Sequence, residues 1–258
     1  MISTFFKYLF IGFVGCGMSD FTALLLYNIN NKIADDPTIT NLLHIKRIPY
    51  SQNIRWFFIH TIANLYITIR STPDLIYGIY NINTCHTDQW IHGYEVYGIV
   101  VALHYYHIAM FRLNITDWIH HISTAVITAP IILATNTTCL SVTGLYFTCG
   151  LPGLVDYMLL WFVKMGWCDK LFEKRVYVYI SVWLRVPGCV YCAVLFLGVL
   201  PTIDEYSWGI FLGRLWSSVI VFWNGLYFMQ ITLKDYYSNH YVNYLKSEKS
   251  SIKHSKTE

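Results

Sequence analysis

The residues most able to do chemistry lie in the stretch TDWIHHISTAVITAP, residues 116–130. A neutral imidazole can act as a general base or as an acyl acceptor near pH 7, so His120 and His121 are candidate catalytic groups. Asp117 lies one helical turn earlier, where it could orient one imidazole as the acid of a catalytic triad does. All three begin a segment that is otherwise apolar enough to span a membrane, where a charged side chain costs about 2.5–3.5 kcal/mol on insertion scales.

Further histidines are expected at the same depth. His104 and His107 end the preceding apolar segment, and the short loop 112–116 makes the two segments antiparallel neighbours. At 3.6 residues per turn, Asp117, His120, His121, Thr124 and Thr128 share one helix face. We therefore expect four histidines to converge. His60 and Asn64, four residues apart on an earlier segment, are expected to line the same site as lipid- or substrate-binding residues.

Three more polar residues are predicted at a similar depth, namely Asp156, Arg185 and Asn224. We expect Asp156 to be part of the catalytic set, Arg185 and Asn224 to bind the ligand, and Asp156 and Arg185 to form an ion pair. Glu95 and Arg214 are predicted to form a second pair. Proline and glycine interrupt the helices beside these residues, at 150–153 and 187–188. Irregular backbone in a membrane is tolerated where it lines a cavity, so we predict a polar cavity in this half of the bundle.

The composition indicates an all-α integral membrane protein. Of 258 residues, 55% are hydrophobic and 13% are charged, and mean hydropathy is +0.41. Soluble domains average about 25% charged residues. A spanning helix needs about 20 mostly apolar residues. The second candidate span contains Pro73, which predicts a short span followed by an interfacial or re-entrant piece. The seven predicted spans are 5–27, 54–80, 90–111, 117–136, 139–164, 176–200 and 207–233.

Positive charges predict the orientation, with the N-terminus outside or lumenal and the C-terminus cytosolic. In this arrangement 14 of the 18 Lys and Arg residues face the cytosol, Lys7 and Arg70 face the other side, and Arg185 and Arg214 lie inside spans. The polar, Lys- and Ser-rich segment 236–258 is predicted to be a disordered cytosolic tail. Cys85 and Cys139 both fall on the outer side; a disulfide between them is one possibility that the sequence leaves open.

The motif residues resemble a known family. His120-His121-Ile-Ser-Thr124 is similar to the HHxxT core of TLC-domain proteins, the group that includes ceramide synthases. The synthases' second motif, HDxxDxxLExxK, is matched here only by Asp156 and Leu159, so the chain looks like a less characterised TLC branch. The resemblance would cover residues 50–235, with 1–49 as an additional N-terminal helix and loop. It implies a helical bundle around a lipid-binding cavity, in the endoplasmic reticulum or a related endomembrane.

Two functions follow as expectations. The first is histidine-dependent transfer of an acyl group to a lipid, with acyl-CoA as co-substrate and with its phosphates near Lys170, Lys174 and Arg175. The second is a non-catalytic sensor or regulator of membrane lipid composition that uses the same cavity. Membrane lipids are the expected partners in both, and no nucleic acid and no resident cofactor or metal are expected. A zinc or iron site built from the histidines, and a channel or transporter, are alternatives that the sequence favours less.

Overall fold

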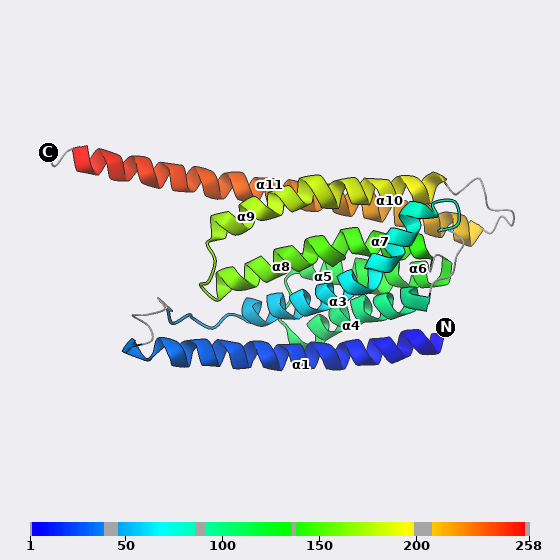
Figure 1. Cartoon of the computed structure of the whole chain (residues 1–258), viewed down its shortest axis with the longest axis horizontal. Coiled ribbons are helices and arrows are strands. Elements are labelled where there is room, and N and C mark those ends of the chain that lie inside the picture. The colour runs from blue at the N-terminus through cyan, green and yellow to red at the C-terminus, as the bar shows by residue number, and fades with distance from the viewer. Residues whose placement is uncertain (1, 39–45, 86–90, 136–137, 199–207, 256–258) are drawn as a thin grey trace.

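The computed structural model describes residues 2–38, 46–85, 91–135, 138–198 and 208–255, and the secondary-structure elements in this part of the chain are all helices. The helices form an elongated bundle with the two termini at opposite ends (Figure 1). The elements, in chain order, are α1 (Ile2–Ala34), α3 (Gln52–Tyr80), α4 (Ile91–Met110), α5 (Ile115–His121), η1 (Ile122–Thr128), α6 (Ala129–Thr135), α7 (Cys139–Leu145), η2 (Tyr146–Gly150), α8 (Leu151–Lys164), α9 (Lys170–Ile180), η3 (Ser181–Arg185), α10 (Val186–Gly198) and α11 (Trp208–Ser255).

Contiguous elements in the described residues join into seven rods, each of which overlaps one of the seven predicted segments, and the first, sixth and seventh rods extend beyond the predicted bounds. Five are long and apolar enough to cross a membrane. The other two, α3 and α4, fall short by that measure. The predicted ends at 90, 136, 199–200 and 207 lie outside the described residues. We call the end that holds loops 111–114 and 165–169 the basic end, because the C-terminus and most of the Lys and Arg residues lie there.

Three of the rods contain a π-helical segment, and each segment ends two residues before a proline. The prolines are Pro130, Pro152 and Pro187. Proline has no N–H and its ring crowds the carbonyl four residues earlier, so the backbone widens locally instead of continuing as a regular α-helix. π segments occur frequently at functional sites. The predicted interruptions at 150–153 and 187–188 therefore take the form of π segments within continuous rods.

Two sequence predictions about helix ends were wrong. Helix α3 runs through Pro73 to Tyr80 without a break, and the hydroxyls of Ser71 and Thr72 donate to the carbonyls of Ile67 and Thr68 beside the proline. Helix α11 continues to Ser255, so the segment predicted as a disordered tail is helical up to that residue. The chain has no proline or glycine after Gly225, and no residue of that type ends the helix.

Close backbone contacts hold α1 on the outside of the bundle against α4. A side-chain carbon at Gly12 would lie 2.7 Å from the Cβ of Ala102, and one at Gly98 would lie 3.0 Å from the backbone nitrogen of Leu9. Small residues at such crossings let the two helix backbones approach closely. Much of the rest of α1 is apolar and exposed, as in Phe10 and Phe21. That composition is the one expected of a helix facing lipid.

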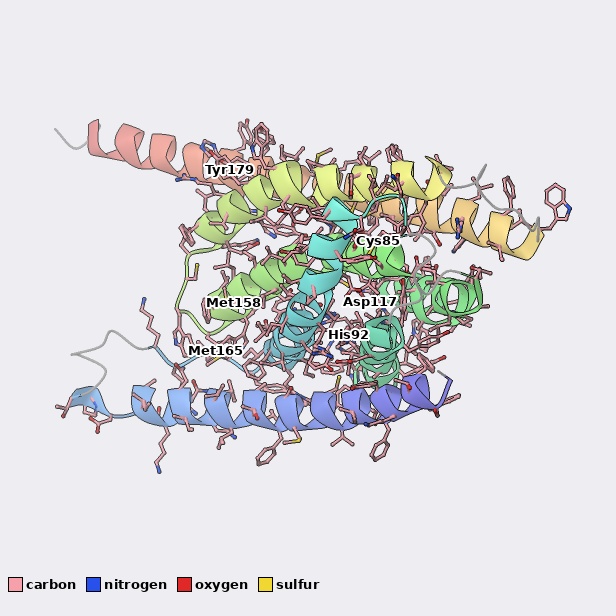
Figure 2. All side chains as sticks on the ribbon, turned by 45° about the vertical axis from the view of Figure 1, so that its right-hand side comes forward. Cys85, His92, Asp117, Met158, Met165 and Tyr179 are labelled. Atoms are coloured by element: carbon pink, nitrogen blue, oxygen red, sulfur yellow. A yellow bond between two sulfur atoms is a disulfide. The ribbon has the colours of Figure 1, made fainter. Side chains whose placement is uncertain are left out.

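A disulfide joins Cys85 and Cys139 at the end of the bundle opposite the basic end. Cys85 follows the C-terminus of α3, where Figure 2 labels it, and Cys139 begins α7. Both residues are buried, and Gly78 packs against their sulfur atoms. This pairing confirms the possibility that the sequence left open.

Candidate functional site

Five histidines from three rods meet near the basic end, as the sequence predicted. The shortest separations between ring centroids are 4.5 Å for His60 and His107, 5.0 Å for His104 and His121, and 5.2 Å for His104 and His120. His107 and His121 are 5.5 Å apart. We call these five residues the histidine cluster. The short connection between α4 and α5 brings four of them together, and α3 adds His60.

Two aromatic side chains that were not among the predicted site residues complete the cluster. The indole of Trp56 stacks on His107 with 3.9 Å between centroids, and the phenol ring of Tyr157 stacks on His60 at 4.0 Å. Trp56 precedes His60 by one helical turn, and Tyr157 follows Asp156. Spacing could therefore have indicated both residues, although an aromatic residue in a span is ordinarily read as packing.

Several imidazole nitrogens in the cluster have no hydrogen-bond partner among the described residues. Both nitrogens of His107 and of His121 are buried and unpartnered, as is Nε2 of His104. The Nδ1 atoms of His60 and His104 contact the carbonyls of Trp56 and Val100, at 3.0 and 2.7 Å. Burying an unpaired polar group costs about 1–3 kcal/mol. The cluster is therefore expensive for the fold unless a ligand or water satisfies it.

His120 differs from the other four histidines in being exposed, and Asp156 and Tyr157 on α8 are partly exposed. His121, next to His120, is buried. Asn64 is buried on α3 against Gly153 of α8.

Arg185 forms the second part of the site. Its guanidinium donates to the hydroxyl of Tyr177, to the carbonyl of Thr148 at 2.7 Å and to Oδ1 of Asn224 at 2.9 Å. It also lies over the ring of Phe228, 4.3 Å from the centroid. Arg185 and Asn224 are thus brought together as predicted. Because Pro152 has no N–H, the Thr148 carbonyl four residues earlier lacks its α-helical donor, and Arg185 takes that place.

The predicted ion pair between Asp156 and Arg185 does not form. Asp156 makes no hydrogen bond or ion pair with any described residue, although Arg185 and Lys174 lie within electrostatic range. The π segment η3 changes the direction in which the side chain of Arg185 leaves its helix. In addition, the Thr148 carbonyl freed by Pro152 accepts a hydrogen bond from the guanidinium. Regular helical spacing and depth, from which the pair was predicted, reflect neither effect.

The predicted pair of Glu95 and Arg214 is also wrong, because Glu95 pairs with Arg70. The Arg70 Nε lies 2.6 Å from the Glu95 carboxylate, which also accepts from Tyr66. His92 lies 2.8 Å from the same guanidinium. Arg70 lies three residues before Pro73, where the second span was predicted to end as a regular helix. Because α3 is continuous there, Arg70 remains on the helix and faces α4.

Asp117 does not orient an imidazole. Its carboxylate accepts from the backbone nitrogen of Asn114 at 3.1 Å, and its own N–H donates to the Asn114 side chain at 2.9 Å, which together form a capping box at the start of α5. None of the described carboxylates bonds to the histidine cluster. The predicted face from Asp117 to Thr128 also breaks at η1, where the spacing is no longer 3.6 residues per turn. Thr128 instead accepts from the indole of Trp216 at 3.2 Å.

The described residues contain no group of three or more His, Cys, Asp or Glu side chains arranged to hold a metal ion. Of the basic residues expected to meet acyl-CoA phosphates, Lys170 and Arg175 are exposed. Lys174 is buried and lies between Glu173 and Asp235, at 3.4 and 3.5 Å. Comparison of the chain with protein-family models, with curated proteins and with solved structures gave no match.

Proposed function

We propose that this chain is an integral membrane protein of the endoplasmic reticulum or a related endomembrane, with seven spans, a lumenal N-terminus and a cytosolic basic end. Five apolar helices support the membrane assignment. The distribution of Lys and Arg supports the orientation. The disulfide at the opposite end agrees with it, because disulfides persist in oxidising compartments such as the lumen. The resemblance to TLC-domain proteins favours an endomembrane.

The function we propose is lipid binding at the histidine cluster, followed by histidine-dependent acyl transfer. One observation carries this proposal: His120 is exposed beside four other imidazoles and lies within electrostatic range of Arg185. Buried nitrogens without partners are costly for folding alone. Polar and charged residues inside membranes usually mark sites of function.

The chemistry would run through His120, the most accessible imidazole. Its neutral nitrogen attacks the carbonyl carbon of an acyl thioester, and the carbon–sulfur bond breaks to release the thiolate of CoA. An amine or hydroxyl of the acceptor lipid then attacks the acyl-imidazole. The carbon–nitrogen bond breaks, the imidazole is restored, and the proton lost by the acceptor ends on the CoA thiolate. Lys170 and Arg175, which are exposed at the basic end, are suited to contact the CoA phosphates.

A second candidate is a non-catalytic lipid sensor that uses the same residues. The role of Asp117 favours it, because that carboxylate caps α5 and does not activate an imidazole. Without a carboxylate partner, a histidine is a weaker general base than one in a triad. Retention of a lipid headgroup needs only hydrogen bonds and charge, which Arg185 and the imidazoles supply.

The test is to purify the protein in detergent, identify bound lipid by native mass spectrometry, and assay acyl transfer from acyl-CoA. Turnover or an acyl-histidine adduct that is lost in His120→Ala and retained in His240→Ala supports the enzyme. His240 is an exposed histidine outside the cluster and serves as the matched control. Unmodified lipid that is lost in Arg185→Gln, with no turnover, supports the sensor. The absence of both lipid and turnover contradicts both candidates, and stoichiometric zinc or iron would favour a metal site.

A further inference from the structure

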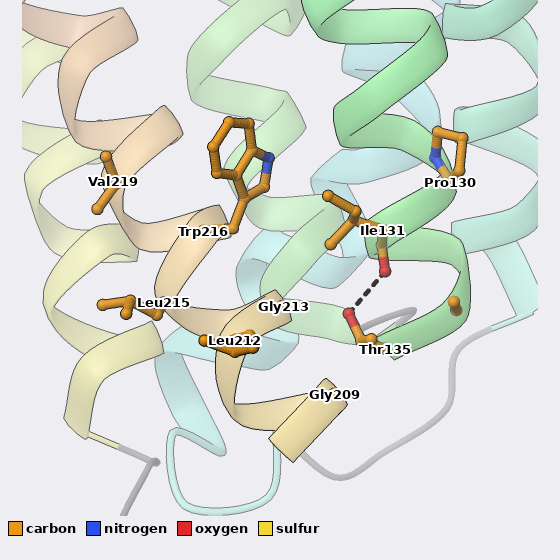
Figure 3. Close-up of a pocket in the computed structure, with 10 residues that line it drawn as sticks. Pro130, Ile131, Thr135, Gly209, Leu212, Gly213, Leu215, Trp216 and Val219 are labelled. Atoms are coloured by element: carbon orange, nitrogen blue, oxygen red, sulfur yellow. Dashed lines mark hydrogen bonds between the residues drawn. The ribbon is translucent and has the colours of Figure 1, made fainter. Parts of the chain in front are cut away.

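An apolar groove lies between α6 and α11, toward the end opposite the basic end (Figure 3). Its volume is about 670 Å³. The lining side chains include Pro130, Ile131 and Ala134 from α6 and Leu212, Trp216 and Val219 from α11. Four of these residues are exposed in the bundle, so the groove is open from the side.

The polar side chains in the groove already have partners. The hydroxyl of Thr135 donates to the Ile131 carbonyl of its own helix at 2.6 Å, as the dashed line in Figure 3 shows. The indole N–H of Trp216 donates to Thr128. These side chains have no donor left for a polar ligand. A groove of this kind favours hydrocarbon, which requires no hydrogen bonds.

The groove and Arg185 lie along the same face of α11. Asn224, which accepts from Arg185, follows Gly213 of the groove by 11 residues. Eleven residues are three helical turns, which places the two residues on one face about 16 Å apart along the axis. One leaflet of the hydrocarbon core is about 15 Å thick. Along this seam the neighbours of α11 change from α6 beside the groove to η3 and α9 nearer the basic end.

Arg185 is a buried cation whose hydrogen-bond partners in the described structure are all uncharged: a phenol, a backbone carbonyl and an amide. Its Nε has no hydrogen-bond partner among these residues. A buried charge is ordinarily paired. His120 is exposed and lies within electrostatic range of Arg185, so an anionic group bound between them could contact both side chains.

We propose that the seam between the α5–η1–α6 rod and α11 binds a lipid with an anionic headgroup and an extended acyl chain. The headgroup lies at Arg185 and His120, and the chain runs along α11 into the α6–α11 groove. This inference rests on the proposed lipid-binding function and defines its ligand class. A carboxylate and a phosphate monoester are both anionic and both accept hydrogen bonds. The ligand is therefore either a fatty acid or a lysophosphatidic acid.

The first experiment maps the chain with two photoreactive probes, palmitic acid and palmitoyl lysophosphatidic acid, each with a diazirine at the chain terminus. Both probes are added to the purified full-length protein, and the labelled peptides are sequenced. Labelling within 130–135 and 209–219 is expected from the probe with the preferred headgroup. Excess unlabelled fatty acid or lysophosphatidic acid identifies which headgroup competes. Labelling confined to α1 or to the lipid-facing side of α10 would overturn the proposal.

The second experiment fills the groove. Ala134 is exposed and lines it, so Ala134→Phe should shorten the space and favour shorter chains. Each two methylene groups displaced should cost about tenfold in affinity. Val194→Phe is the control, because Val194 is exposed on α10 and does not line the groove. If Ala134→Phe retains bound lipid with unchanged chain lengths, the groove assignment fails while the lipid-binding function stands. If the wild-type protein binds neither probe, the proposed function itself fails.

Discussion

The two halves of the bundle differ in how they treat buried polar groups. In the half opposite the basic end, Glu95 is paired with Arg70 and Tyr66, and Cys85 is joined to Cys139. Near the basic end, imidazole nitrogens are left without partners and Arg185 has only uncharged ones. Asp74 is an exception in the first half, because both of its carboxylate oxygens are buried and unpartnered.

Under the proposed function, this difference separates groups that stabilise the fold from groups that bind a ligand. A paired network lowers the energy of the folded chain by itself. An unpaired cluster costs stability, and natural proteins accept such costs chiefly at sites of function. Substitutions in the half opposite the basic end should therefore lower stability and leave lipid binding unchanged. Substitutions in the histidine cluster should reduce lipid binding and leave stability unchanged or increased.

The largest effect on stability is expected from the disulfide. Replacing both Cys85 and Cys139 with Ser opens a crosslink that spans 54 residues of sequence. The free energy of unfolding should fall by about 2–4 kcal/mol, because the crosslink restricts the unfolded chain. Thermal unfolding in detergent measures the change, with Cys168→Ser as the control for a free cysteine. Bound lipid per folded molecule should stay constant, and a loss of lipid would contradict the separation of the two halves.

A somewhat smaller effect is expected at Gly188, where α10 crosses η2. A side-chain carbon there would lie 2.1 Å from the ring of Phe147, so Gly188→Ala forces these elements apart. Overpacking of this kind costs about 1–3 kcal/mol. Gly198, on the same helix, has open space around it, and Gly198→Ala should be neutral or stabilising. Equal melting temperatures for the two variants would mean that η2 does not pack as described.

A double-mutant cycle on Arg70 and Glu95 tests the paired half directly. The variants are Arg70→Ala, Glu95→Gln and the combination, and thermal unfolding is measured for each. Residues in contact typically show coupling of about 0.5–3 kcal/mol, and we expect a value of about 1 kcal/mol because Arg70 is partly exposed. A coupling energy near zero would show that the pair is not a structural element of this half.

The sequence predicted the rods well and the polar contacts less well. Length and hydropathy determine a membrane-spanning helix, and loop length determined that His104, His107, His120 and His121 would meet. The error over the partner of Arg185 arose because side-chain directions were read from regular α-helical spacing. The π segments before Pro152 and Pro187 shift that spacing, so Arg185 bonds to Thr148 and Asn224 instead of Asp156. In α3 the opposite error was made, because Pro73 did not break the helix and Arg70 stayed in reach of Glu95.

The substitution His107→Phe is expected to have the smallest effect on stability among these variants. It is also expected to have the largest effect on function. Its two nitrogens have no described partner and its ring stacks on Trp56, so His107→Phe removes unpaired polar atoms and preserves the stack. Replacing an unsatisfied polar group with an apolar one of similar shape is nearly neutral or stabilising. The melting temperature should therefore stay the same or rise, while bound lipid or acyl transfer is lost. His107→Leu provides a second variant in case the larger phenyl ring is poorly accommodated.

The matched substitution in the other half is Tyr66→Phe. It also removes one polar group from a ring, but here the hydroxyl donates to Glu95, and its loss should cost about 1 kcal/mol while lipid is retained. We expect His107→Phe to keep the melting temperature and lose the lipid, and Tyr66→Phe to lower the melting temperature and keep the lipid. This pair of results is expected only if the histidine cluster binds a ligand and the Glu95 network stabilises the fold. If His107→Phe destabilises the protein as much as Tyr66→Phe does and retains its lipid, then His107 is a packing residue and the boundary of the site must be drawn closer to His120.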